Sequence, residues 1–333
     1  MEKVRVSASV SYDVLIGKGL LNKSGSLIRD VLGECRLAVL TDETVGGLYL
    51  ESLLKSIGDN CMTFIIKPGE QSKTMDNAML FIQAMAQAGI TRSDAVVALG
   101  GGVVGDMAGF AASVYMRGIP FVQIPTTLLA AVDSSVGGKT AVDTNCGKNL
   151  VGTFHQPSLV VCDTDTLTMR DGYAEVIKYA FLSDPELLEC PLQELISRCV
   201  SIKRDIVQSD EYDRGQRALL NFGHTVGHAI EKLSGFEIPH GNAVAKGMYR
   251  AAKIGRQMGL EDCTEAIQST LEKYGFDLSC PYGARQIYET AMADKKREGD
   301  FITLVLPESI GKCGLFKLPV AQFLELLEKT QQC

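Results

Sequence analysis

The sequence lacks any run of about 18 apolar residues, the length that a membrane-spanning helix needs. Its first residues, MEKVRVSASVSYDVLIG, alternate between apolar and polar like a β-strand and show neither the charged start nor the apolar centre of a secretion signal. An excess of positive charge is also missing, because the 333 residues carry a formal net charge of −7. These absences argue against membrane insertion and general nucleic-acid binding, and they predict a cytoplasmic protein.

Closely spaced cysteines are absent as well. The ten cysteines are scattered without a C-x-x-C pair, which argues against a zinc knuckle or a dithiol redox motif. We expect reduced thiols, most of them buried. Internal repeats, low-complexity tracts and charged tails are also missing.

The first half of the sequence alternates between strand-like and helix-like segments. Apolar runs such as RLAVLTD, DAVVALGGG and IPFVQIPTT are separated by amphipathic stretches such as NAMLFIQAMAQAG. From Asp171 onward the strand pattern fades, and helical patterns such as GYAEVIKYAFL and LQELISRCVSIKRDIV dominate. We therefore predict an N-terminal Rossmann-like α/β domain at residues 1–168 and a mainly α-helical domain at residues 169–333.

A glycine-rich turn follows the apolar run AVVAL and comes before the small-residue segment MAGFAASVYM. It reads Gly100-Gly101-Gly102-Val103-Val104-Gly105-Asp106. Glycines at such a turn let backbone N–H groups approach a pyrophosphate at a helix N-terminus. A tight turn without a ligand is an equally good explanation for an isolated match. An acid some 20 positions later, which usually binds the ribose, is missing, and Asp42 at the end of RLAVLTD is the alternative. The pattern indicates a nucleotide site of a variant kind.

Three of the four histidines fall within 17 residues. In RALLNFGHTVGHAIE a single helix would place Arg217, Asn221, His224 and His228 on one face. His224 and His228, four residues apart, could form a metal-binding pair. Gly223 and Gly227 would let another element approach the backbone closely, at a helix cost of about 1 kcal/mol each.

A second helical segment, GYAEVIKYAF, places Glu175 and Lys178 three residues apart. An exposed ion pair on an amphipathic helix would explain this pair without any function. Together with the histidines and internal cations, however, the carboxylate favours a catalytic zinc site with open coordination.

Several cations lie among glycines or near the polar helix face. They are Lys139, Lys148, Lys203, Arg217, Lys295 and Lys296. Each alone could be a solvated surface residue. Their association favours a pocket for a substrate with two anionic groups, such as a phosphate and a carboxylate, and the guanidinium fork of Arg217 suits the carboxylate.

An ordered set of motifs resembles the 3-dehydroquinate synthase family over nearly the whole chain. The motifs are PGEQSKT (68–74), GGGVVGD (100–106), IPTTLLAAVDSSVGGKT (124–140), GKN (147–149), AEVIKY (174–179), LLNFGHTVGHAIE (219–231), HGNAVAKGM (240–248) and DKK (294–296). The resemblance implies zinc, or Co²⁺ as a substitute, bound by Glu175, His224 and His240. His228 would then contact substrate and would not be a metal ligand.

The resemblance also implies two further sets of residues and a homodimer. NAD contacts would come from Asp42, Glu70, Gln71, Lys73, Gly101, Gly102, Val103, Val104, Gly105, Asp106, Thr126, Thr127, Asp133, Lys139, Lys148 and Thr166. Catalytic and substrate contacts would come from Asp133, Lys139, Asn149, Glu175, Lys178, Lys203, Arg217, Asn221, His228 and Lys296. Arg117 would reach the neighbouring subunit's site in the homodimer.

The family reaction converts 3-deoxy-D-arabino-heptulosonate 7-phosphate into 3-dehydroquinate and phosphate in the shikimate pathway. The resemblance implies transient oxidation by NAD, elimination of phosphate, reduction and an intramolecular aldol closure. Three alternatives stay open: a sugar-phosphate cyclase that makes an inosose or valiolone, a metal-dependent polyol dehydrogenase of the glycerol dehydrogenase kind, and a non-catalytic nucleotide-binding regulator. Between Leu167 and Asp171 the chain departs from the family pattern, because the segment TLTMRD (166–171) lacks the usual proline-containing turn.

Overall fold

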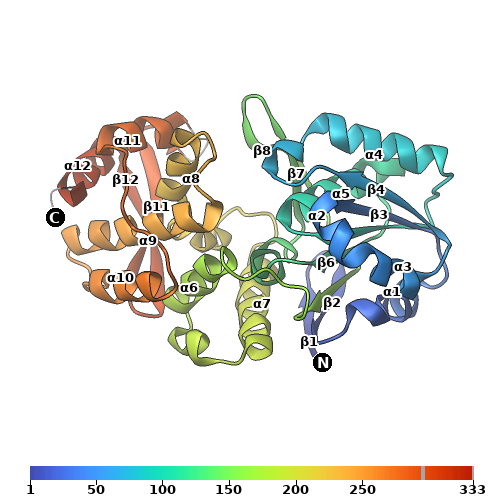
Figure 1. Cartoon of the computed structure of the whole chain (residues 1–333). Coiled ribbons are helices and arrows are strands. Elements are labelled where there is room, and N and C mark those ends of the chain that lie inside the picture. Colours follow the sequence, from blue (N-terminus) through green and yellow to red (C-terminus); the bar gives the residue numbers. More distant parts are fainter. Residues whose placement is uncertain (294–296, 332–333) are drawn as a thin grey trace. The chain divides into compact units, whose positions relative to one another are not determined.

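The computed structural model describes residues 1–293 and 297–331 and divides into two compact units. The first unit comprises Met1–Met169 and Pro191–Tyr212, and the second comprises Arg170–Cys190 and Asp213–Cys333. Figure 1 shows an open α/β sheet in the first unit and a group of helices with a small sheet in the second. This confirms the predicted fold class. None of the helices in the described ranges is long and apolar enough to span a membrane.

A seven-stranded sheet forms the centre of the first unit, in the order β1-β2-β9-β6-β5-β3-β4. The strands are β1 (Glu2–Ser7), β2 (Ser11–Gly17), β3 (Leu37–Asp42), β4 (Cys61–Ile66), β5 (Ala95–Gly100), β6 (Phe121–Pro125) and β9 (Leu159–Asp163). Neighbouring strands are parallel except β1 and β2, which form an antiparallel hairpin with Val4 opposite Val14. The single N-terminal strand that the alternation predicts is therefore two strands.

The central strands are apolar on both faces because helices cover both. In β5, Val96 and Ala98 belong to one hydrophobic cluster, and Val97 and Leu99 belong to another. This division follows from the alternation of side chains along a strand. Helices α4 (Met75–Gln87) and α5 (Gly102–Val114) supply side chains to the first cluster, and α1 (Ser24–Leu32) and α3 (Glu51–Ile57) supply the second (Figure 1).

A hairpin that the sequence reading missed follows β6. Its strands are β7 (Lys139–Thr144) and β8 (Gly147–Phe154), which pair antiparallel in a separate two-stranded sheet. In the structure Gly152 must be a glycine, because a Cβ there would lie 2.4 Å from the backbone oxygen of Thr140.

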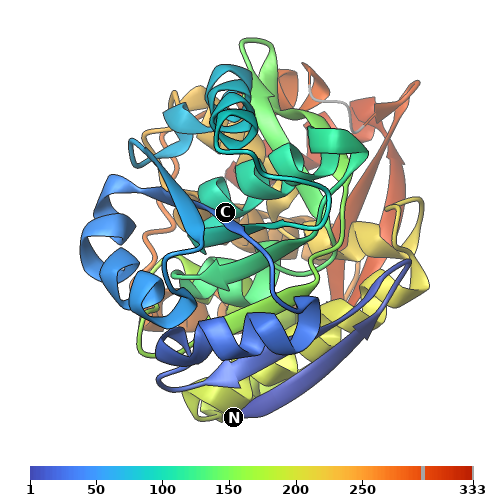
Figure 2. The same cartoon turned by 90° about the vertical axis from the view of Figure 1, so that its right-hand side faces the viewer.

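Helix α7 (Leu192–Ser209) packs with the first unit although it lies far along the chain. Figure 2 shows it running beside β1. One side chain near the C-terminal end of α7 and one just after it hold the helix there. The N–H of Ser7 donates to Gln208 Oε1 at 2.7 Å, and the hydroxyl of Ser9 donates to Oε1 of Glu211, two residues after the helix, at 2.5 Å. A division of the chain at residue 168 places this helix with the second unit, so a linear boundary does not describe the packing.

The second unit contains six α-helices and a small sheet within the described residues. The helices are α6 (Gly172–Leu182), α8 (His224–Leu233), α9 (His240–Gln257), α10 (Thr264–Lys273), α11 (Ala284–Ala293) and α12 (Val320–Gln331). The strands are β10 (Arg297–Glu298), β11 (Phe301–Ser309) and β12 (Lys312–Pro319), paired antiparallel in that order. The segment FITLVLPES is thus a strand that the sequence reading missed.

Short helical segments complete both units. They are α2 (Glu43–Val45), 3₁₀ turns at Leu21–Lys23, Glu70–Ser72, Tyr115–Arg117, Pro185–Glu189 and Gln216–Asn221, and π turns at Gly46–Leu50 and Ala130–Ser134.

Candidate functional site

Three helices of the second unit bring together one carboxylate and two imidazoles. Glu175 comes from α6, His224 is the first residue of α8, and His240 is the first residue of α9. Potential ligand atoms of these three residues lie within 4.8 Å of one another. Glu175 is fully buried and His224 is nearly so, whereas the His240 side chain is 33% exposed. Two of the three potential ligands, Glu175 and His224, are therefore enclosed by protein, and His240 is partly accessible to solvent.

The spacing of these donors fits a small metal ion. Nε2 of His224 lies 3.4 Å from Glu175 Oε1, and Nε2 of His240 lies 3.6 Å from the same oxygen. Ligand atoms about 2.0–2.2 Å from a tetrahedral Zn²⁺ lie about 3.3–3.6 Å from one another. One carboxylate and two imidazoles also form a donor set that suits zinc and related metals and leaves a coordination position open.

Glycines at the contact of α8 and α9 let the two histidine-bearing helices approach closely. A Cβ on Gly247 would lie 1.9 Å from the carbonyl oxygen of Gly223, and one on Gly227 would lie 3.0 Å from the oxygen of Ala243. This confirms the prediction that Gly223 and Gly227 allow another element to approach. The absence of side chains at this contact lets the start of α8 pack closely against residues 243–247 of α9, and these two helices carry His224 and His240.

The single helix predicted for RALLNFGHTVGHAIE is wrong. A 3₁₀ turn covers Gln216–Asn221, the chain then leaves the helical conformation, and α8 begins at His224 after Gly223 with φ +79°. Arg217 and Asn221 therefore do not share a helix face with His224 and His228. The left-handed conformation of Gly223 is one that side chains disfavour, and it re-aims the chain immediately before the first histidine.

His224 is held by the turn that precedes it. Its Nδ1 lies 3.0 Å from the carbonyl oxygen of Phe222, a fully buried residue. With Nδ1 donating to that carbonyl, Nε2 is the nitrogen available to a metal. His228 is one turn further along α8, with its ring edge-on to that of His224 at a centroid distance of 5.3 Å. His228 belongs to a second possible donor set, with Glu231 and His240.

Lys178 and Glu175 form a buried ion pair on α6. Their side chains are 1% and 0% exposed, so the alternative of an exposed surface pair is wrong. The cation partly balances the cost of burying the carboxylate. At His240, burial lowers the pKa, but the carboxylates of Glu175 and Glu231 outweigh it and raise that pKa to about 10. A cation is thus strongly favoured among these carboxylates.

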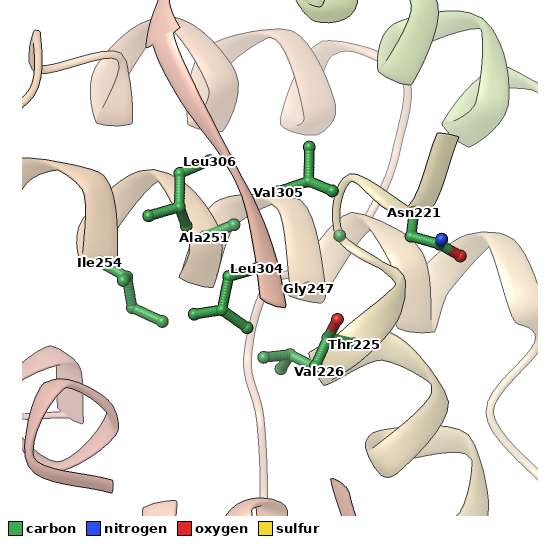
Figure 3. A pocket seen from close by; sticks show the side chains of 10 residues that line it. Asn221, Thr225, Val226, Gly247, Ala251, Ile254, Leu304, Val305 and Leu306 are labelled. Atoms are coloured by element: carbon green, nitrogen blue, oxygen red, sulfur yellow. The ribbon is translucent and has the colours of Figure 1, made fainter. Parts of the chain in front are cut away.

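Arg217 and Asn221 lie on the 3₁₀ turn that precedes α8. Arg217 is 2% exposed, which does not fit a solvated surface residue. Asn221 lines a pocket with residues of α8, α9 and β11, which Figure 3 shows with the Asn221 amide and the Thr225 hydroxyl as the labelled polar groups. The rest of the lining is apolar or glycine, and none of Glu175, His224 and His240 belongs to it. This pocket is therefore not the candidate metal site.

In the first unit, the glycine-rich turn connects β5 to α5 as predicted. Gly100 packs so tightly that a Cβ would lie 2.6 Å from Cβ of Val104. On Gly101 and Gly102 a Cβ would lie 3.2 Å from Thr127 and Ser134. The cap residue Gly101 supplies no side-chain hydrogen bond to the start of α5, so the first amides of this helix suit an anion.

Lys73, Asp106 and Asn149 form one network in the first unit. Lys73 is 4% exposed, and its Nζ lies 2.6 Å from Asp106 Oδ2 and 2.6 Å from Asn149 Oδ1. Burial lowers the pKa of Lys73, but Asp106 and Glu70 outweigh it and hold that pKa above its ordinary value. Lys148, which precedes Asn149 in the sequence, forms a second ion pair with Glu70. Its Nζ lies 3.5 Å from Glu70 Oε1. The sequence motifs that supply these residues thus converge in space.

Other predicted nucleotide contacts occupy the ends of strands and the turns after them. Asp42 ends β3 and caps α2, with Oδ1 accepting hydrogen bonds from Thr44 and Val45 at 2.9 Å. Among the described residues, the buried hydroxyl of Thr126 is one of a few without a hydrogen-bond partner, so it fits a polar ligand. Thr166 donates its hydroxyl to the backbone oxygen of Asp163. Gln71 lies in the Glu70–Ser72 turn, and Val103 lies on α5.

Of the predicted substrate contacts in this unit, Asp133 and Lys203 lie together. Nζ of Lys203 on α7 lies 2.8 Å from Asp133 Oδ1 and 2.5 Å from the Asp133 carbonyl oxygen. Lys139 is exposed at the start of β7. Arg117 is exposed too, in a turn where Met116 and Arg117 have φ of +48° and +71°. Lys296, the remaining predicted contact, lies outside the described residues.

Glu231 is a residue of the site that the sequence reading did not select. It is 4% exposed and its Oε2 lies 3.3 Å from Nδ1 of His240. A signal was present in the sequence. Glu231 is seven positions after His224 and three after His228, and both spacings place it on the helix face that carries these histidines.

Two family profiles match consecutive parts of the chain. The profile described as 3-dehydroquinate synthase N-terminal matches residues 63–174, and the one described as 3-dehydroquinate synthase C-terminal matches residues 172–297. The chain is 42% identical over 344 aligned positions to the 3-dehydroquinate synthase of Enterococcus faecalis (strain ATCC 47077 / OG1RF), and the alignment covers 96% of each chain.

Two solved structures of cyclases share the fold and were determined with cofactors. A 2-deoxy-scyllo-inosose synthase complexed with carbaglucose-6-phosphate, NAD⁺ and Co²⁺ is 26% identical, with a TM-score of 0.87 over 98% of this chain and 99% of that one. ValA, a 2-epi-5-epi-valiolone synthase of Streptomyces hygroscopicus subsp. jinggangensis 5008 with NAD⁺ and Zn²⁺ bound, is 27% identical, with a TM-score of 0.87 over 99% of each chain.

Proposed function

The chain belongs to the 3-dehydroquinate synthase family and converts 3-deoxy-D-arabino-heptulosonate 7-phosphate into 3-dehydroquinate and phosphate, and we propose that it does so with NAD and one divalent metal held by the residues described above. In reaction class this is a phosphate-eliminating carbon–oxygen lyase. The proposed ligands are Glu175, His224 and His240, with Zn²⁺ as the metal and Co²⁺ as a substitute.

A single observation carries the metal assignment: Nε2 of His224 and of His240 lie 3.4 and 3.6 Å from the same oxygen of the fully buried Glu175. An unbalanced carboxylate at such a position would cost several kcal/mol. Lys178 supplies one positive charge beside it, and a divalent ion would supply more. Lys178 would in addition keep the carboxylate in the ionised form that a ligand requires.

NAD would supply an acceptor for a hydride that is later returned, and the metal would supply a Lewis acid that lowers the pKa of a substrate hydroxyl. For NAD, support comes from the uncapped start of α5, the buried hydroxyl of Thr126 and the charged network around Lys73. The start of α5 would bind the pyrophosphate, and Lys73 would hold Asp106 and Asn149 in place.

The remaining residues would bind and orient the two anionic ends of the substrate. Arg217 is proposed to bind the carboxylate through its guanidinium fork, with Lys203, and its burial favours a strong charge-assisted hydrogen bond. The phosphate contacts are proposed to be Lys139, Asn149, Asn221 and Lys296, and His228 is proposed to contact the substrate beside the metal ligands. Holding the substrate chain in a reactive conformation would favour the closing aldol step.

Two further proposals concern the state of the protein in the cell. We propose a cytoplasmic homodimer in which the exposed Arg117 reaches the partner's site. The exposure of Arg117 supports a contact with a partner subunit. Its turn has two consecutive residues with positive φ, and such strained backbone is common at functional sites.

One assay tests the cofactor proposal. The purified protein is stripped with a chelator and incubated with heptulosonate phosphate, Zn²⁺ and NAD at a concentration below that of the substrate. We expect stoichiometric phosphate and dehydroquinate, no net NADH and no product without metal. Net NADH accumulation would instead favour a polyol dehydrogenase, and full turnover in the stripped protein would contradict the metal proposal.

A further inference from the structure

We infer that Glu231, which is not a proposed metal ligand, is a positioning residue that orients His240 and strengthens its bond to the metal. This inference rests on the proposed metal site and deepens it. It concerns the carboxylate on the far side of the His240 ring from Glu175.

The two ring nitrogens of His240 face two different carboxylates. Nε2 lies 3.6 Å from Glu175 Oε1, and Nδ1 lies 3.3 Å from Glu231 Oε2. A proton on Nδ1 donated to Glu231 leaves the Nε2 lone pair directed toward Glu175, where the metal is proposed. A carboxylate acting on the second nitrogen of a ligating imidazole fixes its tautomer and raises its basicity.

His240 needs such an anchor more than the other ligands do. Glu175 is buried beside Lys178, and His224 is held by the carbonyl oxygen of Phe222. His240 follows the connection between α8 and α9, and its side chain is 33% exposed. Without a contact at Nδ1 its ring could adopt other rotamers, and metal binding would have to restrict them.

Glu231 also occupies a position that is costly for an anion. It is 4% exposed and lies near the end of α8, where the last carbonyl groups disfavour negative charge. A buried carboxylate there requires a positive partner. His240 bound to a divalent metal is such a partner, because the metal increases the positive charge on the ring.

A simpler explanation is that Glu231 only pairs with a protonated His240. The two explanations predict opposite effects. If Glu231 only stabilised the protonated ring, removing its charge would reduce proton competition and leave metal affinity unchanged or increased. If Glu231 orients the metal-bound ring, removing its charge decreases the affinity.

The experiment measures Zn²⁺ affinity by competition with a chromophoric chelator. The variants are Glu231→Gln, which keeps volume and a hydrogen-bond acceptor, and Glu231→Ala. Glu237→Gln is the matched control, because it removes an exposed charge from the connection that leads to His240. We expect affinity to fall about tenfold in Glu231→Gln and up to about 100-fold in Glu231→Ala, with no change in the control. If Glu231→Ala fails to fold, Glu231→Gln decides.

Two further readouts separate positioning from a general structural role. The visible absorption spectrum of the Co²⁺-loaded protein should change in Glu231→Gln but not in Glu237→Gln, because the ligand field depends on ring orientation. Turnover by Glu231→Gln should recover as Zn²⁺ is raised to saturation, while its KM for the substrate stays near that of the wild type.

Each outcome decides a different claim. Affinity within twofold of the wild type in both Glu231 variants would overturn this inference alone. Loss of all binding in Glu231→Ala together with retention in Glu175→Ala would place the metal among His228, Glu231 and His240 and overturn it as well. Absence of Zn²⁺ binding by the wild type would overturn the proposed metal site itself.

Discussion

Replacing Gly247 with alanine should separate the two helices that carry His224 and His240. The added Cβ would lie 1.9 Å from the Gly223 carbonyl oxygen and 2.8 Å from the Gly227 nitrogen. Both are backbone atoms, so no side chain can rotate away. An ordinary contact there begins at 3.4 Å, and the helices would have to move apart by on the order of 1.5 Å to reach it.

The same substitution at Gly255 is the matched control, because Gly255 lies on the same helix. There the nearest atoms would be 3.5 Å away, and alanine should stabilise the helix by up to about 1 kcal/mol. Overpacking against backbone in Gly247→Ala should cost about 3 kcal/mol, with about 1 kcal/mol recovered from helix propensity. The two variants should therefore differ by about 3 kcal/mol in the free energy of unfolding.

Thermal unfolding and Zn²⁺ affinity together check this reasoning. If the second unit, about 140 residues, unfolds cooperatively, 3 kcal/mol corresponds to a difference of about 10 °C in Tm. Gly247→Ala should also bind Zn²⁺ more weakly than Gly255→Ala, because His224 and His240 are displaced. Equal Tm values for the two variants, or a more stable Gly247→Ala protein, would refute the role of the glycine contact.

Three other substitutions test the charged groups. Lys178→Met should destabilise the metal-free protein by about 3 kcal/mol or more by leaving Glu175 buried without its cation; Zn²⁺ should then raise Tm more than in the wild type, and an equal or smaller gain would argue against the site. Lys73→Met should weaken NAD binding at least about tenfold, measured calorimetrically, because Asp106 loses its buried partner; unchanged affinity would contradict the nucleotide assignment. Arg217→Lys should raise KM for the substrate about tenfold although charge is conserved, and unchanged kinetics would exclude a bidentate contact.

Local patterns in the sequence were sufficient for most elements. Apolar runs predicted the parallel strands because those strands are buried on both faces, and helical periodicity predicted α4, α6 and α7. The glycine turn before α5 was predicted from backbone requirements alone. The ordered motifs identified the family, although no single one of them was specific enough.

The composition of the candidate metal site was only partly predictable from spacing. Helical spacing paired His224 with His228, whereas the structure sets His224 beside Glu175 and His240. The latter residues come from different helices, so no local period connects them. The motif resemblance proposed this set, and the distances in the structure now support it.

The sequence by itself determined most of the strands and helices, although not the β7–β8 hairpin or β11, and it contained the residues of both candidate sites. Tertiary structure alone decided the break before α8, the packing of α7 with the first unit, the burial of Lys178 with Glu175 and the contact of Glu231 with His240. The physical reason is that hydrophobic periodicity reports only which face of a segment is buried. Which segments meet there depends on close approaches, such as that of Gly247 to Gly223, that join positions distant along the chain.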